Sequence, residues 1–184
     1  MKTNLKIFAA VGIMLGFVMG ANAQSAVTHG VTANASVQTK LLVSQVQPLE
    51  FGTVDNVDAQ TKTVSVDGTA TSSGSAPGQT GVQAGIGQIV RTGDAMITYK
   101  LVSPITNLAG PSGSLLPIKD FVTSYSFTQG GVKTAGNAVA SDTPVQGTGN
   151  DIFVYIGATV TPDATKTTSV GLHTASITLS AEYN

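Results

Sequence analysis

Few residues of this sequence have the types and spacing that catalyse a reaction. The chain contains two histidines, His29 and His173, and each lies in a run where apolar and polar residues alternate. A histidine within such a run is far more often a hydrogen-bonded structural residue than a general base or a metal ligand. The sequence has no cysteine and no H-x-x-x-H pair, so the common zinc-ligand sets are missing.

The remaining motifs match functional patterns only in part. Gly110-Pro-Ser112-Gly-Ser114 is similar to the G-x-S-x-G turn that presents a nucleophilic serine, but it lacks the final glycine. Gly85-Ile-Gly87 lies in a strand-like segment with no helix after it, which does not predict a dinucleotide-binding loop. Asp55 and Asp58 lack the ligand density of a calcium-binding loop. We therefore expect neither an enzyme nor a cofactor.

The first 23 residues predict a secretory signal peptide. Lys2 and Lys6 precede an apolar stretch at residues 7–19, and Ala21-Asn-Ala23 forms a small-residue cleavage site. A retained membrane anchor is the alternative, but the apolar stretch is shorter than the roughly 20 helical residues that span a bilayer. We expect a single mature domain at residues 24–184, exported to the periplasm and then to the cell surface or the extracellular medium.

The composition of the chain favours strands and excludes several partners. Charged residues make up only 10% of it, there is no tryptophan, and the mature part carries seven basic and ten acidic residues without a basic run. That balance argues against nucleic acid as a partner. Without cysteine the domain cannot form disulfides, so packing and backbone pairing must stabilise it. Serine, threonine, valine, alanine and glycine dominate, which is typical of strands and turns.

The pattern of apolar residues predicts an all-β fold, an antiparallel two-sheet immunoglobulin-like sandwich of about seven strands. Turn residues separate short alternating segments, Phe51 is a candidate core anchor, and no segment predicts a helix. A membrane β-barrel is the competing architecture, but it needs longer strands and aromatic girdles. The expected strands are the one that follows the N-terminal arm and ends by residue 46, residues 63–66, 82–90, 95–101, 121–127 and 152–160, and the terminal strand within residues 171–184.

The two ends of the mature chain show the clearest alternation. From His173 onward every second residue falls on one face, which predicts one long terminal strand with a buried side. Near the N-terminus a similar alternation extends beyond the usual strand length of about 5 or 6 residues, so residues 24–36 are a candidate free arm before the first strand. The alternating arm residues are Val27, Val31, Ala33, Ala35 and Val37.

Three segments carry a family resemblance. They are Pro48-Leu-Glu-Phe51-Gly52-Thr53-Val54, Gly93-Asp-Ala-Met-Ile-Thr-Tyr99, and the closing stretch from Gly171 through Ala-Ser-Ile-Thr-Leu to Tyr183-Asn. Together with the alternating N-terminal stretch they resemble the domain-of-unknown-function family numbered 4402, over essentially the whole mature chain. The family name implies secreted β-sandwich proteins and supplies no activity.

The C-terminus also resembles that of chaperone–usher pilins. Gly171 is fourteenth from the end and Tyr183 is penultimate, as in the terminal strand of those subunits. The resemblance implies donor-strand assembly, in which the N-terminal arm of one subunit completes the sandwich of the next, helped by a periplasmic chaperone and an outer-membrane usher. The disulfide that is common among major pilins is absent here.

Two functional hypotheses follow. The first is a fimbrial or surface-filament subunit whose partners are copies of itself or related subunits, assembled by β-strand donation. Its donor face is the arm set given above, and its assembly strand comprises Gly171, Ala175, Ile177, Leu179 and Tyr183. The second is a self-complete sandwich that binds a carbohydrate or surface ligand through the Ser/Gly-rich loops at residues 69–81 and 129–151. Those loops lack the tryptophans on which sugars usually stack, so we place it second and an enzyme third.

Overall fold

The computed structural model describes residues 41–55, 60–73, 80–91, 93, 95–102, 105–137, 141–146, 151–163 and 168–184. Within these ranges the only helical element is a single 3₁₀ turn, Pro111–Gly113, and the other elements are strands. No helix in the described ranges is long and apolar enough to cross a membrane. The expected signal peptide and the arm residues Val27, Val31, Ala33, Ala35 and Val37 lie outside the described residues.

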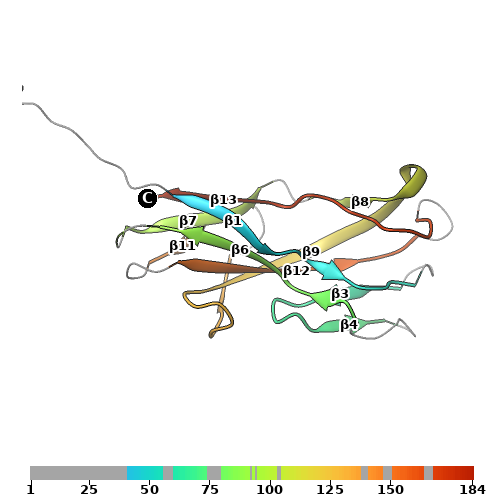
Figure 1. Ribbon diagram of the computed structural model, residues 1–184, viewed down its shortest axis with the longest axis horizontal. Coiled ribbons are helices and arrows are strands. Elements are labelled where there is room, and N and C mark those ends of the chain that lie inside the picture. The colour runs from blue at the N-terminus through green and yellow to red at the C-terminus, as the bar shows by residue number, and fades with distance from the viewer. Residues whose placement is uncertain are drawn as a thin grey trace, which may run out of the picture. The chain divides into compact units, whose positions relative to one another are not determined.

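The larger sheet is built around β12 (Ile152–Val160), as Figure 1 shows. One edge of β12 pairs first with β6 and then with β3, and its other edge pairs with β9, always antiparallel. Nearly all residues of β12 are buried, whichever face they point to, which agrees with the continuous apolar run at residues 152–156. The sheet comprises β1 (Leu42–Gln47), β6 (Gly85–Val90), β12, β3 (Lys62–Val64) and β4 (Ala70–Ser72), with β8 (Asn107–Ala109) and β10 (Thr134–Ala135) paired to β9 (Leu115–Ser126).

The smaller sheet has three strands in the order β11 (Thr143–Val145), β7 (Ile97–Val102) and β13 (Thr178–Tyr183). A further pair, β2 (Glu50–Phe51) and β5 (Val82–Gln83), forms a two-stranded ribbon beside the larger sheet. All of these pairings are antiparallel.

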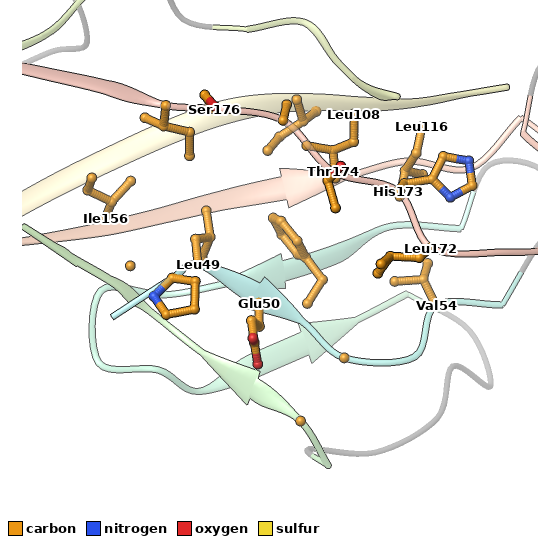
Figure 2. Close-up of a pocket in the computed structure, with 18 of the residues that line it drawn as sticks. Leu49, Glu50, Val54, Leu108, Leu116, Ile156, Leu172, His173, Thr174 and Ser176 are labelled. Atoms are coloured by element: carbon orange, nitrogen blue, oxygen red, sulfur yellow. The ribbon is translucent and has the colours of Figure 1, made fainter. Parts of the chain in front are cut away.

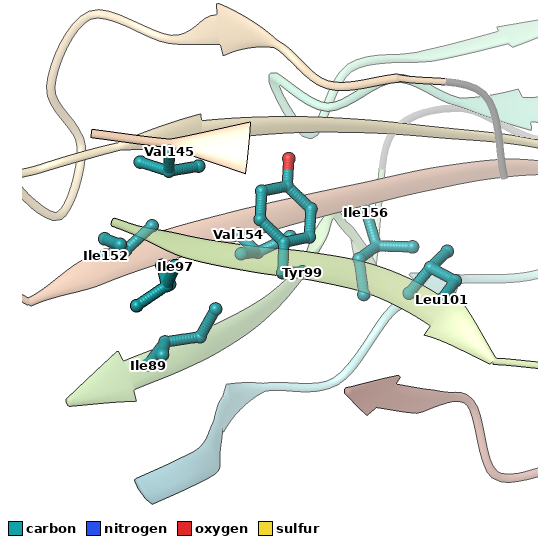
Figure 3. Packing of buried hydrophobic residues seen from close by; sticks show 8 residues of the cluster. All are labelled: Ile89, Ile97, Tyr99, Leu101, Val145, Ile152, Val154 and Ile156. Carbon is teal, nitrogen blue, oxygen red and sulfur yellow. The ribbon is translucent and has the colours of Figure 1, made fainter. Parts of the chain in front are cut away.

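The main core lies between the two sheets (Figure 3). Alternate residues of β7 point inward, and Ile97, Tyr99 and Leu101 keep only 0%, 1% and 2% of their surface exposed. They pack against Ile89 of β6 and Val154 of β12, both fully buried. Because side chains alternate along a strand, each sheet has one apolar face, and the apolar faces of the two sheets pack against each other.

A second, smaller core lies under the β2 and β8 end of the larger sheet. It contains Phe51, Val64, Leu116, Ile118, Ala158 and Val160. Phe51 is buried, with 8% of its surface exposed, which confirms its expected role as a core anchor.

The predicted fold class is confirmed: the protein is an all-β, antiparallel two-sheet sandwich. It contains more strands than the expected seven or so because two- and three-residue segments such as β2 and β10 form strands of their own. Near the middle of β9, Asp120 has a φ of 52°, and the β9–β12 register shifts between Gly157 and Thr159. This bulge bends β9, so that one long strand serves both cores.

The terminal strand is shorter than predicted. A strand from residue 171 onward was expected, but β13 begins at Thr178, and the preceding segment makes only an isolated bridge between Ala109 and Thr174. The reason is geometric. This segment first contacts β8 of the larger sheet and then pairs with β7 of the smaller one, so regular pairing is interrupted where the chain crosses between sheets.

Candidate functional site

A long groove runs between two chain segments that face each other at the open side of the sandwich (Figure 2). One wall is residues 43–55, which contain β1 and β2, and the other is residues 168–179. The groove has a volume of about 1350 Å³, and its floor includes Gly85, Gly87, Leu116, Ile118 and Ile156. Figure 2 shows Leu172, His173 and Val54 toward one end of it and Ile156 and Ser176 toward the other.

β1 borders the groove as the last strand of the larger sheet, and its inner face is only partly covered. Val43 pairs with Ile89 of β6, so the two side chains point to the same face of the sheet. Ile89 is 0% exposed and Val43 is 36% exposed. The opposite layer, whose strand β13 reaches β1, therefore covers this position of β1 only in part.

β13 is the corresponding edge of the smaller sheet. Its inward residues Leu179 and Ala181 pair with Leu101 and Tyr99 of β7, which are almost fully buried, yet both β13 side chains remain half-exposed. Among the described residues, β7 is the only strand paired with β13. In the described part of the chain β1 pairs only with β6 and β13 only with β7, so each of these two borders has one strand edge outside the ladders.

Two glycines let the walls of the groove lie close to its floor. A Cβ atom on Gly85 would lie 3.1 Å from Leu49 Cβ, and one on Gly87 would lie 2.6 Å from Leu179 Cδ2. Neither position has room for a side chain while the walls keep their present places. Glycine at these two inward positions of β6 thus lets the walls approach the floor closely.

The strap, residues 168–177, forms the wall that leads into β13 and is fastened to the larger sheet. Ala109 N donates a hydrogen bond to Thr174 O at 2.9 Å, and Thr174 N donates to Ala109 O at 2.8 Å. Thr168 Oγ1 donates to Leu115 O at 2.7 Å. These contacts hold the strap against β8 and the start of β9, which positions the groove wall.

His173 joins the strap to the loop before β9. Its Nε2 lies 2.9 Å from Ser114 Oγ, and its Nδ1 lies 3.0 Å from Gly171 O. Nδ1–H donating to the carbonyl and Nε2 accepting from the hydroxyl satisfy both atoms in the neutral ring. A Cβ on Gly110 would lie 2.3 Å from His173 Nε2, so the ring packs directly on that backbone.

The expectation that His173 is a hydrogen-bonded structural residue is confirmed. Ser114 was missed as its partner because the two are 59 positions apart in the sequence. The arrangement pairs a hydroxyl with an imidazole, but the group at Nδ1 is a backbone carbonyl, and Ser114 is buried. The pair therefore fastens the strap, and we assign it no chemical step.

The described groove lining contains acidic side chains but no lysine or arginine. The acidic residues are Glu50 and Asp55. Lys62 lies nearby with 1% of its surface exposed, and its Nζ donates to Thr53 O at 2.8 Å. Burial lowers the pKa of Lys62, and the neighbouring Asp55 partly counteracts this.

The structure brings together four of the five residues expected in the assembly strand. Gly171, Ala175, Ile177 and Leu179 line the groove, although only Leu179 belongs to β13. Tyr183 lies at the far end of β13, paired with Ile97, and does not line the groove.

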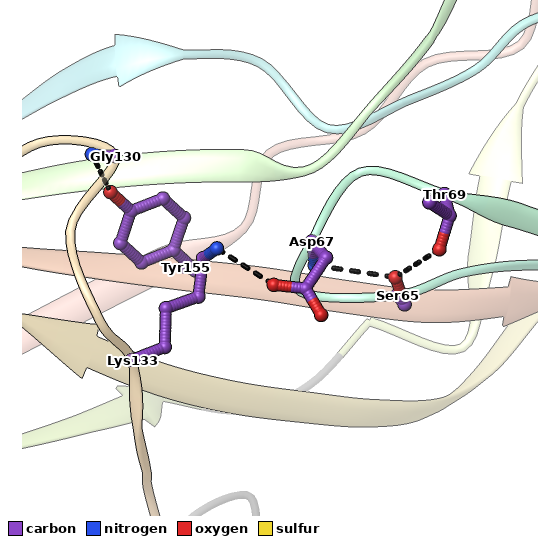
Figure 4. Close-up of polar contacts among 6 residues, drawn as sticks. All are labelled: Ser65, Asp67, Thr69, Gly130, Lys133 and Tyr155. Carbon is purple, nitrogen blue, oxygen red and sulfur yellow. Dashed lines mark hydrogen bonds and ion pairs between the residues drawn. The ribbon is translucent and has the colours of Figure 1, made fainter.

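A polar cluster on the outer side of the larger sheet is a second candidate (Figure 4). Lys133 Nζ pairs with Asp67 at 2.7 Å and lies 4.7 Å from the centre of the Tyr155 ring, and Gly130 N donates to Tyr155 Oη at 2.6 Å. These groups satisfy one another and fasten the β3–β4 turn to the loop after β9. The described residues contain no group of three or more His, Asp or Glu side chains that could hold a metal ion.

Comparison with models of known protein families, with curated proteins and with solved structures found no match. The resemblance to family 4402 and to pilins therefore stays a prediction from the sequence.

Proposed function

We propose that this protein is an exported structural subunit of a fimbria or surface filament, and that the groove accepts a β-strand donated by a neighbouring copy. The observation that carries the proposal is that the groove is bordered by two strand edges, β1 and β13, whose inward side chains stay partly exposed. A strand placed between them would gain backbone hydrogen bonds from the edges and bury alternate side chains in the groove.

The dimensions of the groove suit a peptide strand. At about 1350 Å³ it is larger than the roughly 300–1000 Å³ typical of small-molecule sites. Its strap-and-β13 wall extends over residues 168–179, about 40 Å if extended at roughly 3.3 Å per residue. The only aromatic side chain in its described lining is the buried Phe51, so this surface offers no aromatic platform for a sugar ring.

The N-terminal arm is the segment of the mature chain that suits this groove best. The other stretches outside the described residues are at most six residues long, too short to span it, whereas residues 24–40 precede β1 as one stretch. Residues 27–37 contain no acidic side chain, and His29 is their only basic one, so the acidic lining would not repel them. Their alternating Val27, Val31, Ala33, Ala35 and Val37 would enter the groove.

Donation between copies is favoured over insertion of the arm into its own domain. An arm that folded back would form a hairpin with β1, and its turn would be residues 38–40, Gln-Thr-Lys. Tight hairpin turns use Gly, Asn or Asp at positions that need a positive φ, and this turn has none of them. By the sequence resemblance, a periplasmic chaperone and an outer-membrane usher are the partners proposed for export and assembly.

The proposal is tested by light scattering on the purified mature chain, residues 24–184, with and without a synthetic peptide of residues 24–38. We expect polymers, or a monomer that the peptide stabilises. A peptide present at about 100 times its dissociation constant adds roughly 2.7 kcal/mol of stability. For a domain of this size that corresponds to a rise in melting temperature of about 5–10 °C.

Two controls sharpen the test. A peptide of the same composition in shuffled order should not stabilise the chain, because its apolar residues no longer alternate. Deleting residues 24–35 should abolish polymers while leaving a chain that still responds to the peptide. A strict monomer that is indifferent to the peptide would overturn the proposal and favour the self-complete sandwich, whose predicted loops lie partly outside the described residues.

A further inference from the structure

Two of the most exposed large apolar side chains lie together at one end of the groove. Val170 and Leu172 of the strap expose 89% and 80% of their surfaces, and both belong to the groove lining. The two side chains, two positions apart on the strap, form the exposed apolar part of the rim at this end. At the other end, the corresponding apolar residue is Met96, which exposes 41% of its surface.

The two ends of the domain are distinguished by its topology. Leu42 pairs with Val90, Tyr183 pairs with Ile97, and residues 91–96 join β6 to β7. The start of β1 and the end of β13 therefore lie at the same end, as Figure 1 shows. Thr178, where β13 begins, pairs with Val102 at the other end of β7, and the strap with Leu172 precedes it. Each subunit's own arm must leave from the Tyr183 end, because it precedes Leu41 in the chain.

The length of the arm determines how close the donor must come. Only residues 38–40 separate Val37, the last arm residue expected in the groove, from Leu41 of the donor. Extended chain covers at most about 3.6 Å per residue, so roughly 14 Å of linker remains. The folded body of the donor must therefore lie directly against the end of the groove from which its arm emerges.

An arm running antiparallel to β13 would emerge at the Leu172 end, away from the point where the acceptor's own arm leaves. Donor bodies and departing arms would then be at opposite ends of each subunit, which yields an open head-to-tail chain. The reverse direction would bring the donor body and the acceptor's own arm to the same end. The strongly exposed apolar pair lies at the end that the antiparallel direction requires.

We propose that Val170 and Leu172 form a second contact between neighbouring subunits, covered by the folded body of the copy whose arm fills the groove. This inference rests on the proposed function, because a donor body is brought to the rim only if strand donation occurs. The rim contact would restrict bending between consecutive subunits.

Because the chain contains no cysteine, a single engineered one can carry an environment-sensitive fluorophore. Leu172→Cys in the mature chain should show a larger blue shift of emission on polymerisation than when the peptide of residues 24–38 binds alone, because only polymerisation brings a donor body onto the rim. Val132→Cys, at a position that exposes 95% of its surface on the loop after β9, is the matched control and should not shift in either case. Met96→Cys reports on the opposite end.

The double substitution V170S/L172S supplies a second measurement. We expect it to raise the chain concentration needed for half-maximal polymerisation at least tenfold and to weaken peptide binding by a clearly smaller factor, because both residues also line the groove. V132S should have no effect on either. Polymers in which position 172 shifts no more than with the peptide alone, a larger shift at position 96 instead, or an equal loss of peptide binding would overturn the rim contact alone. If the unmodified chain neither polymerises nor binds the peptide, strand donation itself fails, and the rim contact with it.

Discussion

Replacing Gly87 with valine should close the groove from its floor while the sandwich stays folded. A Cβ at this position would lie 2.6 Å from Leu179 Cδ2, and the nearest atom outside Leu179 is Ser44 O at 3.8 Å. The obstacle is therefore the end of one flexible side chain, and that side chain borders the groove. Valine should push Leu179 into the space that a donated strand would occupy.

The substitution affects two free energies, that of unfolding and that of peptide binding. For folding, three added carbons contribute about 0.8 kcal/mol each when buried, and a β-branched residue adds up to about 1 kcal/mol in a strand. Overpacking costs about 1–3 kcal/mol, so the free energy of unfolding should change by less than about 2 kcal/mol. For binding, exclusion of one apolar side chain of the incoming strand forfeits about 1.5–3 kcal/mol, which is roughly 10- to 150-fold in the dissociation constant.

The assay is titration of the peptide of residues 24–38 into each mature chain, with urea unfolding in parallel. Ser180→Val is the matched control, because it adds bulk to the same strand as Leu179 but on its opposite face. G87V should lose peptide affinity and S180V should keep it. If G87V folds normally and binds the peptide as tightly as the unmodified chain, the groove above Gly87 is not where the strand docks.

Three further predictions test the structure itself. His173→Ala should lower the free energy of unfolding by about 1–3 kcal/mol, because it leaves the buried Ser114 hydroxyl without its partner. Adding Ser114→Ala should cost less than the sum of the single changes in a double-mutant cycle, and strict additivity would contradict the pairing. Leu101→Ala should cost about 2–5 kcal/mol in urea unfolding, against less than about 0.5 kcal/mol for Val132→Ala, and equal effects would argue against the assigned core. Burial raises the pKa of the Tyr99 phenol above 10.0, so the unfolded chain loses this proton first. The raised pKa of Tyr99 therefore stabilises the folded chain fully below about pH 10, and this stabilisation is lost as the pH rises through the folded-state pKa. Tyr99→Phe should flatten the decline of the free energy of unfolding, measured by urea unfolding from about pH 9 to about pH 11.5.

Much of the fold could be predicted from local patterns. The continuous apolar run at residues 152–156 predicted a strand covered on both faces, and β12 is paired on both edges and buried. The alternation of residues 95–101 likewise predicted which side of β7 is buried. Both predictions succeeded because the period of side-chain direction along a strand is a local property.

The groove could be predicted only in outline. Alternation indicated that Leu179 faces inward, but it could not indicate which strand edges lack a partner, because that depends on the order of strands in space. The strap illustrates the same limit. Its alternation continues as if it were a strand, yet it crosses between two sheets and is held by Ser114 and Ala109, which are distant in the sequence.

The direction of the arm decides between donation and self-insertion, and a turn substitution can change which one occurs. An arm inserted into its own domain would run antiparallel to β1 through a turn at residues 38–40, whereas a donated arm is expected to run antiparallel to β13. The substitution Q38N/T39G introduces the Asn-Gly pair that favours two-residue hairpin turns. It should convert polymers into monomers with a filled groove, while Q38S/T39S should still polymerise. If the Asn-Gly variant polymerises as readily as the unmodified chain, its turn does not oppose self-insertion, and the argument that the Gln-Thr-Lys turn favours donation fails.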